Sequence, residues 1–113
     1  MLNAAWLRMN PKQQRLWQSI SVVPQKWQLH PWGDQIGGFW VVGIIGPRVI
    51  WYNEYEEGFN LSRYSQYGAI DQYWCNQDEL EWTIQGILNE LDLTPPARPP
   101  QPGAFGSAAG QDT

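Results

Sequence analysis

The sequence holds one cysteine and one histidine among its 113 residues. One cysteine cannot form an internal disulfide, and this pair falls short of a zinc site with three or four Cys and His ligands. We therefore expect no structural metal and no other cofactor. Gly-rich phosphate loops, nucleophile elbows and Rossmann fingerprints are absent from the sequence as well. These absences favour a protein that is not an enzyme.

Positive charge is also scarce. Seven Lys and Arg residues stand against eleven Asp and Glu residues, which gives a formal net charge of −4. Such a surface repels a phosphate backbone, so we expect no nucleic-acid partner. No run approaches the ~20 apolar residues of a membrane span. The N-terminal residues lack the basic start and the unbroken apolar stretch of a secretory signal, so a cytoplasmic protein without membrane contact is expected.

Aromatic residues are abundant instead. The chain contains eight Trp, and 42% of its residues are hydrophobic, which is enough for the core of one domain. Beyond Leu93 the sequence changes to TPPARPPQPGAFGSAAGQDT, which is nearly free of aliphatic side chains. We predict a single domain over residues 1–93 and a disordered Pro/Gly/Ala-rich tail over residues 94–113. Pro96 and Pro99 match the loose PxxP pattern of polyproline ligands, although a linker has the same composition.

Two helices of useful length are predicted, after a first ten residues that could form a short helical turn or two. Asn10, Pro11 and Gln13 form a capping pattern, which predicts a helix from Pro11 to Ile20. Asn76 followed by Glu79 predicts a second cap and a helix from Gln77 to about Leu91. The buried stripe of this helix would be Leu80, Ile84, Ile87, Leu88 and Leu91.

Alternating and apolar runs between these helices predict an antiparallel sheet. The expected strands are Lys26–His30, Phe39–Ile45, Val49–Glu56 and Phe59–Ser65, with Gly58 at positive φ in the last turn. The fold class is therefore α+β: an antiparallel β-meander of three to four strands, with an N-terminal helix and a C-terminal helix packed on the sheet. Because Phe39–Ile45 is apolar on both faces, we expect a homodimer or a protein partner to help cover the sheet.

Two residues could carry chemistry. His30 stands four residues before Asp34, so an acid/base pair is conceivable, yet no nucleophile lies nearby in the sequence and exposed polar surface explains the histidine as well. The start of the second helix could lower the pKa of Cys75 and favour its thiolate. Burial of this thiol beside Trp74 is the favoured interpretation. No catalytic residue is assigned.

The stretch WYNEYEEGFNLSRYSQYG offers the clearest binding surface. We expect Trp51, Tyr55, Phe59 and Leu61 to face the C-terminal helix. A cross-strand aromatic ladder that only stabilises the sheet explains the same residues. The opposite face would present an acidic, aromatic surface, and the residues predicted to bind are Tyr52, Glu54, Glu56, Asn60 and Tyr64, together with Trp32 from an earlier turn.

Two functions remain open at this point. The first is a protein-interaction module, such as a small inhibitor or adaptor, that binds a basic protein through this face. The second is a binding domain for a small polar ligand such as a carbohydrate. In that case Trp32, Trp51 or Tyr52 would form a stacking platform, and Asn53 and Asn60 would form hydrogen bonds with the ligand.

Overall fold

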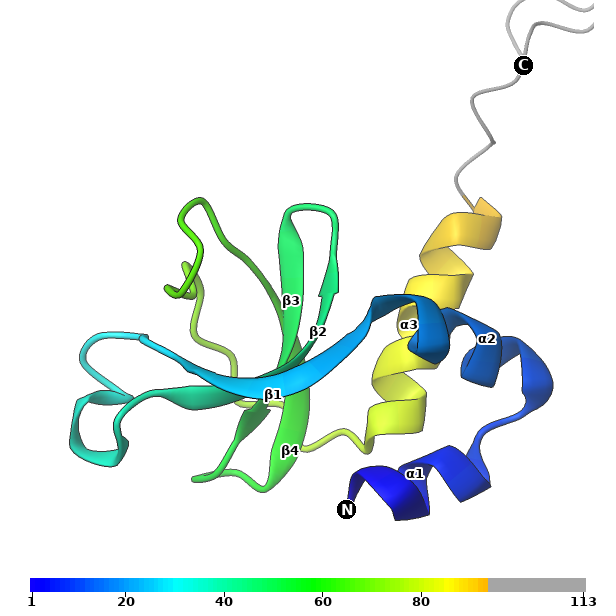
Figure 1. Ribbon diagram of the computed structural model, residues 1–113, viewed down its shortest axis with the longest axis horizontal. Helices are drawn as coiled ribbons and strands as arrows, with labels where there is room; N and C mark the ends of the chain where they lie inside the picture. Colours follow the sequence, from blue (N-terminus) through cyan, green and yellow to red (C-terminus); the bar gives the residue numbers. More distant parts are fainter. Residues whose placement is uncertain (94–113) are drawn as a thin grey trace, which may run out of the picture.

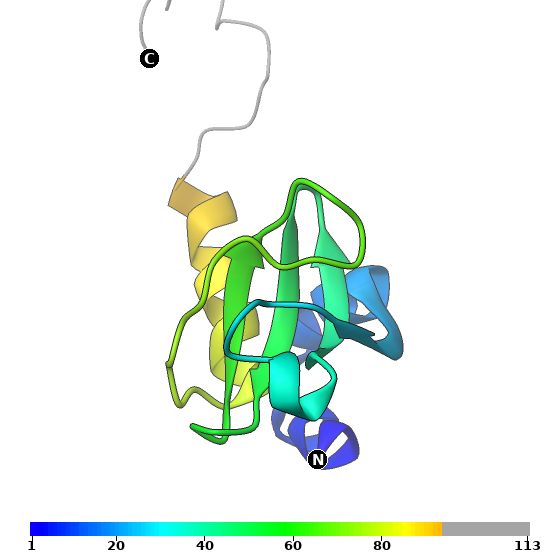
Figure 2. The same ribbon diagram turned by 90° about the vertical axis from the view of Figure 1, so that its left-hand side faces the viewer.

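The computed structural model describes residues 1–93, and Figure 1 shows how they are arranged. Three α-helices lie on one side of a four-stranded antiparallel sheet. Long connections lie against the opposite side, in front of the sheet in Figure 2. This arrangement confirms the predicted α+β class. The predicted tail over residues 94–113, with its PxxP pattern, lies outside the described residues.

The N-terminal helices follow the local sequence signals. Helix α1 (Leu2–Arg8) is the short helix expected in the first ten residues, and α2 (Pro11–Ile20) has the predicted bounds. The Asn10 Oδ1 accepts a hydrogen bond from the Gln13 backbone N–H at 2.8 Å, and the Gln13 Oε1 accepts one from the Asn10 N–H at 2.9 Å. This reciprocal capping box satisfies two of the N–H groups at the start of α2.

Helix α3 (Leu80–Leu93) begins three residues later than predicted. The predicted cap residue, Asn76, is bound to the sheet instead, because its backbone N–H donates to the Asn60 Oδ1 at 2.9 Å. Four residues of the predicted stripe are buried against the sheet, namely Leu80, Ile84, Ile87 and Leu88. The fifth, Leu91, is 55% exposed, because the last turns of α3 lean away from the sheet (Figure 1).

The strands are β1 (Ser21–Trp27), β2 (Phe39–Ile45), β3 (Arg48–Asn53) and β4 (Gly58–Arg63), and each pairs antiparallel with the next along the chain. The bounds predicted for β2 are confirmed. Strand β1 begins directly after α2, five residues before the predicted start. Pro24 is tolerated there because β1 is an edge strand and its register with β2 shifts between Ser21 and Gln25.

The turn between β3 and β4 differs from the prediction in two ways. Strand β3 ends at Asn53 because its side-chain Oδ1 accepts the backbone N–H groups of Tyr55 and Glu56, at 3.0 and 3.4 Å. The positive φ angle, 55°, belongs to Glu57 and not to Gly58. Gly58 is required for a different reason: a Cβ there would lie 2.3 Å from the Gln77 Cα.

Both faces of the sheet are covered by the chain itself. The helix-side cluster contains Ala5, Met9, Trp17, Ile20, Val42, Ile50, Phe59, Leu80, Ile84, Ile87 and Leu88. The loop-side cluster contains Trp27, Leu29, Phe39, Val41, Val49, Trp51 and Ile70. Strand β2 contributes to both clusters, so its two-sided apolar pattern needs no second molecule. The argument from this strand to a homodimer or partner is therefore wrong, and the homodimer itself stays a prediction.

Candidate functional site

The connection between β4 and α3, residues 64–79, is bound to the sheet by buried side chains as well as by backbone hydrogen bonds. Asn60 accepts the Asn76 N–H, and the Ser62 hydroxyl donates to the Gln72 carbonyl oxygen at 2.8 Å. Ser62 also accepts the indole N–H of Trp51 at 2.8 Å. Asn60 and Ser62 are buried, so these bonds satisfy polar groups that water cannot reach. Residues 72–78 of the connection are thereby fixed along the outer edge of β4.

The register of β4 shows which of its backbone groups face outward. The Phe59 N–H donates to the Asp78 carbonyl oxygen at 2.8 Å, and the Arg63 N–H donates to the Gln72 Oε1 at 3.0 Å. Because outward groups recur at every second residue of an antiparallel strand, the N–H and C=O of Leu61 face the same way. Neither forms a hydrogen bond outside the sheet within residues 1–93. Strand β4 is therefore open at Leu61.

A groove of about 610 Å³ lies over this open edge. Helix α3 forms one wall, the β4–α3 connection forms the other, and β4 forms the floor. The lining residues are Arg48, Phe59, Asn60, Leu61, Arg63, Gln72, Trp74, Asn76, Asp78, Trp82, Thr83, Gly86, Ile87 and Glu90. We call this feature the β4 groove. Its volume lies in the range of ligand sites in proteins.

Two indole rings in this lining are unusually exposed. Trp74, from the β4–α3 connection, is 48% exposed, and Trp82, from α3, is 61% exposed. Exposed rings in a concave lining favour binding, because a ligand that covers them removes a large apolar area from water. Sequence reasoning missed both. The available signal was Trp82 itself, which lies off the buried stripe of α3 at a position where helical spacing predicts solvent exposure.

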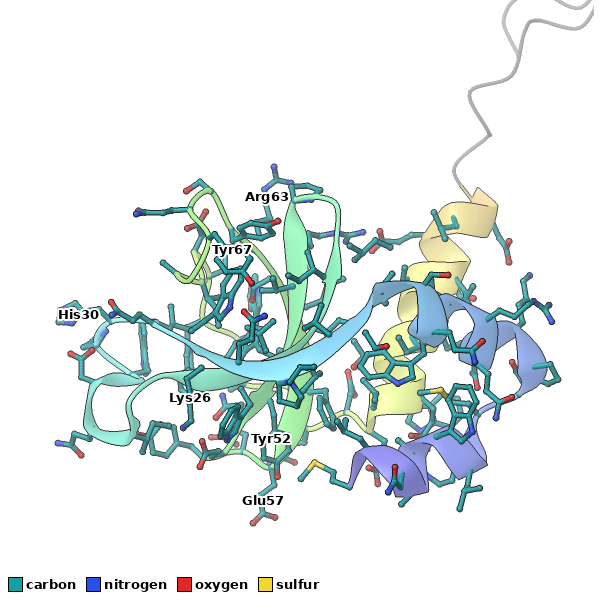
Figure 3. All side chains as sticks on the ribbon, viewed as in Figure 1. Lys26, His30, Tyr52, Glu57, Arg63 and Tyr67 are labelled. Carbon is teal, nitrogen blue, oxygen red and sulfur yellow. The ribbon has the colours of Figure 1, made fainter. Side chains whose placement is uncertain are left out.

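The charges of the groove differ between its ends. At the end near the C-terminus of α3, Arg48 Nη2 lies 2.9 Å from Glu90 Oε1, and this hydrogen bond lowers the pKa of Glu90. Arg63 lies at that same end of the sheet (Figure 3) and forms no ion pair within residues 1–93. At the other end, the Asp78 carboxylate also forms no ion pair within the described residues. A ligand could thus interact with either free charge.

The β3–β4 turn carries the acidic residues that the sequence singled out, Glu54, Glu56 and Glu57, which we call the acidic hairpin. Lys26 Nζ lies 3.3 Å from the Glu54 carboxylate and partly neutralises it. Burial raises the pKa of Tyr52, and the charges of Glu57, Glu54 and Glu79 raise it further. Figure 3 shows Tyr52 and Glu57 together at this end of the sheet. Negative potential is therefore concentrated there.

The predicted binding residues do not share one face. Tyr52 pairs with Phe59 and packs on the helix-side cluster, whereas Asn60 pairs with Trp51 on the loop side. The expected grouping of Trp51 with Phe59 and Leu61 is therefore wrong. Tyr64 also lies on the loop side, where its ring meets Trp27 edge-on at 5.1 Å. Of the residues predicted to bind, Tyr52 and Glu54 lie close enough together for the Glu54 charge to raise the pKa of Tyr52.

The residues proposed for a sugar platform are mostly inaccessible. Trp51, Asn53 and Asn60 are buried, and Asn53 donates to the Tyr73 hydroxyl and the Trp74 carbonyl. Their polar groups form hydrogen bonds within the chain, and their contact with a ligand stays a prediction. Trp32 is exposed and stacks on Tyr73, with ring centroids 4.5 Å apart.

The two candidate reactive residues differ in outcome. His30 Nδ1 lies 2.6 Å from Asp34 Oδ2, so the predicted pair forms, in full contact with solvent and at the far end of the molecule from α3 (Figure 3). Cys75 is exposed, which contradicts its predicted burial beside Trp74. The cause is that Asn76, the next residue, is held at the edge of β4 rather than at a helix start, so residue 75 lies on the surface of the connection.

Comparisons of the chain with protein-family models, curated proteins and solved structures found no match. Within residues 1–93, no three His, Cys, Asp or Glu side chains are grouped so that they could hold a metal ion. No helix in the described part of the chain is long and apolar enough to cross a membrane. The site must therefore be interpreted from its own geometry.

Proposed function

We propose that the chain is a non-enzymatic protein-interaction module that binds a segment of a partner protein in the β4 groove. The observation that carries this proposal is the exposure of Trp74 and Trp82 on the two walls of one groove, over an open strand edge. Trp is enriched among the residues that dominate binding energy at protein interfaces. Replacing one such residue by Ala weakens binding by about 2 kcal/mol, or roughly 30-fold.

The charge distribution favours a basic partner. Asp78 lies at the hairpin end of the groove, where its carbonyl oxygen accepts a hydrogen bond from the Phe59 N–H at the start of β4. The Gln77 Nε2 donates to the Glu56 carboxylate at 3.3 Å, which joins the groove wall to the acidic hairpin. Together with the net charge of −4, this arrangement would accelerate encounter with a basic segment and make association sensitive to salt.

A random peptide display library tests the proposal. The baits are the full wild-type chain and a variant with Pro95, Pro96, Pro99 and Pro100 replaced by Ala, so that binding is also measured without the chain's own proline-rich sequence. We expect enrichment of basic peptides, and a loss of that enrichment in the double variant Trp74→Ala, Trp82→Ala. Trp32→Ala is the matched control, since Trp32 is 46% exposed and lies outside the groove.

Two outcomes would decide against the groove. Equal enrichment with and without the two groove tryptophans would contradict the proposal. Loss of peptide binding in the Trp32→Ala control would move the peptide site to the Trp32–Tyr73 stack. Reversing Glu54 and Glu56 to Lys should slow association with the selected basic peptides and reduce its salt dependence.

Sedimentation of wild type and double variant over a concentration series shows whether a homodimer uses the same groove.

A further inference from the structure

The β4 groove presents several free hydrogen-bond donors within the described residues. Its lining contains the indole N–H groups of Trp74 and Trp82, the backbone N–H of Leu61 and the guanidinium of Arg63. None of these four donates a hydrogen bond outside the sheet within residues 1–93. The carboxylate of Glu90, by contrast, already accepts two bonds from Arg48. A matching ligand should therefore present free carbonyl oxygens to these donors, and a cation for the Asp78 carboxylate, which forms no ion pair within residues 1–93.

A proline-rich segment has this chemistry. Each proline has a carbonyl oxygen but no N–H, and the polyproline II conformation leaves its backbone carbonyls free for a partner. Such segments bind in grooves lined by aromatic rings, and their low conformational entropy reduces the cost of ordering them. An ordinary added β-strand fits less well, because only Leu61 on β4 offers both an outward N–H and an outward C=O without partners in the described residues.

We propose that the β4 groove is a polyproline-binding site and that Pro95 to Pro100 of the same chain occupies it. The inference rests on the proposed function, since it assigns a ligand to the same groove. The sequence PPARPP begins two residues after Leu93, where α3 ends, and Glu90 of α3 lines the groove at that end. No other segment of the chain has comparable proline content.

Length and charge both allow this contact. Pro95 to Pro100 is a segment of six residues, which in polyproline II conformation would span about 19 Å. The groove runs beside α3, whose 14 residues measure about 21 Å, so the segment can turn back and follow it. Arg98 is the only cation in that part of the sequence, and Asp78 at the far end of the groove forms no ion pair within residues 1–93.

The consequence is a module that partly masks its own site. A tethered segment acts at an effective concentration on the order of 1 mM. With an intrinsic Kd on the order of 0.1 mM, it would weaken the binding of a competing peptide about tenfold. A partner with a stronger segment would displace the tail, so the tail would set the affinity threshold for partners.

The indole N–H signals of the full-length, ¹⁵N-labelled protein give a direct test. All eight tryptophans lie within residues 1–93, so each signal reports on the folded part alone. Replacing Pro95, Pro96, Pro99 and Pro100 by Ala should shift the Trp74 and Trp82 signals and leave the Trp32 signal in place. Adding a synthetic peptide of residues 94–102 to that variant should return the two signals toward their wild-type positions. The control variant Gln111→Ala, Asp112→Ala should change none of them.

Two results would overturn the inference. The first is identical Trp74 and Trp82 signals in the wild type and the four-proline variant. The second is a shift that depends on protein concentration, which would place the segment in the groove of another copy. Failure of the proposed function would give another result: the Trp74 and Trp82 signals would differ between wild type and the four-proline variant, yet neither bait would enrich peptides. Equal peptide binding by both baits would instead remove the tail from the groove and leave the proposed function standing.

Discussion

Replacement of Ser62 by Ala should destabilise the domain and loosen the wall of the β4 groove. The Ser62 hydroxyl is a relay between two layers: it accepts the indole N–H of Trp51 and donates to the Gln72 carbonyl, both at 2.8 Å. Trp51 is completely buried in the loop-side cluster, and Gln72 lines the groove. Removal of one oxygen atom therefore breaks the connection between the core of the sheet and the groove.

The magnitude follows from the burial of the two partners. The Trp51 N–H would remain inside the protein without an acceptor, which costs about 1–3 kcal/mol. The Gln72 carbonyl is only partly buried, so water can replace the lost donor and the net loss is about 0.5–1.5 kcal/mol. The free energy of unfolding should fall by about 1.5–4.5 kcal/mol in total. In a domain of this size that corresponds to a Tm lower by about 6 °C or more.

Urea unfolding followed by tryptophan emission measures this change. Ser65→Ala is the matched control, because Ser65 is exposed and its hydroxyl reaches Asp71 only at 3.4 Å, so its effect should stay within about 0.5 kcal/mol. A double-mutant cycle with Trp51→Phe should show a favourable coupling energy between residues 51 and 62. If Ser62→Ala unfolds at the same urea concentration as Ser65→Ala, the relay contributes no stability and the reasoning is refuted.

Two further predictions concern other parts of the same fold. Gly58→Ala should lower the free energy of unfolding by about 1–3 kcal/mol, because its Cβ would lie 2.3 Å from the Gln77 Cα. Gly86→Ala, whose Cβ meets no atom within 4 Å, should raise it by about 0.5–1 kcal/mol. Equal urea midpoints for the two variants would contradict this prediction. The hydrogen bond from Arg8 lowers the pKa of Glu81, so its stabilising contribution is present above the unfolded pKa and is lost as the pH falls toward the folded value. Urea midpoints measured between pH 7 and pH 3 should fall less steeply for Glu81→Gln than for wild type, and parallel curves would refute the assignment.

The parts of the fold that were predicted correctly have local causes. Asn10, Pro11 and Gln13 are close enough in sequence to form one cap, and the bounds of α2 follow from it. Strand β2 is an unbroken apolar run between turns that contain glycine. In each case the determining contacts lie within a few residues of one another. Propensity and periodicity are sufficient to predict an element when the contacts that determine it are local.

The face assignment failed because it depends on the register between two strands. Four residues, 54–57, separate β3 from β4, and Asn53 pairs with Gly58. Trp51 is therefore opposite Asn60, and Tyr52 is opposite Phe59. A register that differs by one residue moves every side chain of a strand to the other face. The Asn53 side chain decides the register by closing the turn, and its role is visible only in three dimensions.

The β4 groove could not be predicted either, because it too depends on contacts between residues that are distant in the sequence. A fifth strand beside β4 would lie about 4.8 Å away and would occupy the N–H and C=O of Leu61. The β4–α3 connection is bound instead by Asn60 and Ser62, whose side chains project to the face opposite α3. The backbone of the connection is thereby displaced toward the loop side between its edge contacts at Phe59 and Arg63. The space left over Leu61 is the groove, so two buried polar side chains in an apolar sheet create the surface that we propose for binding.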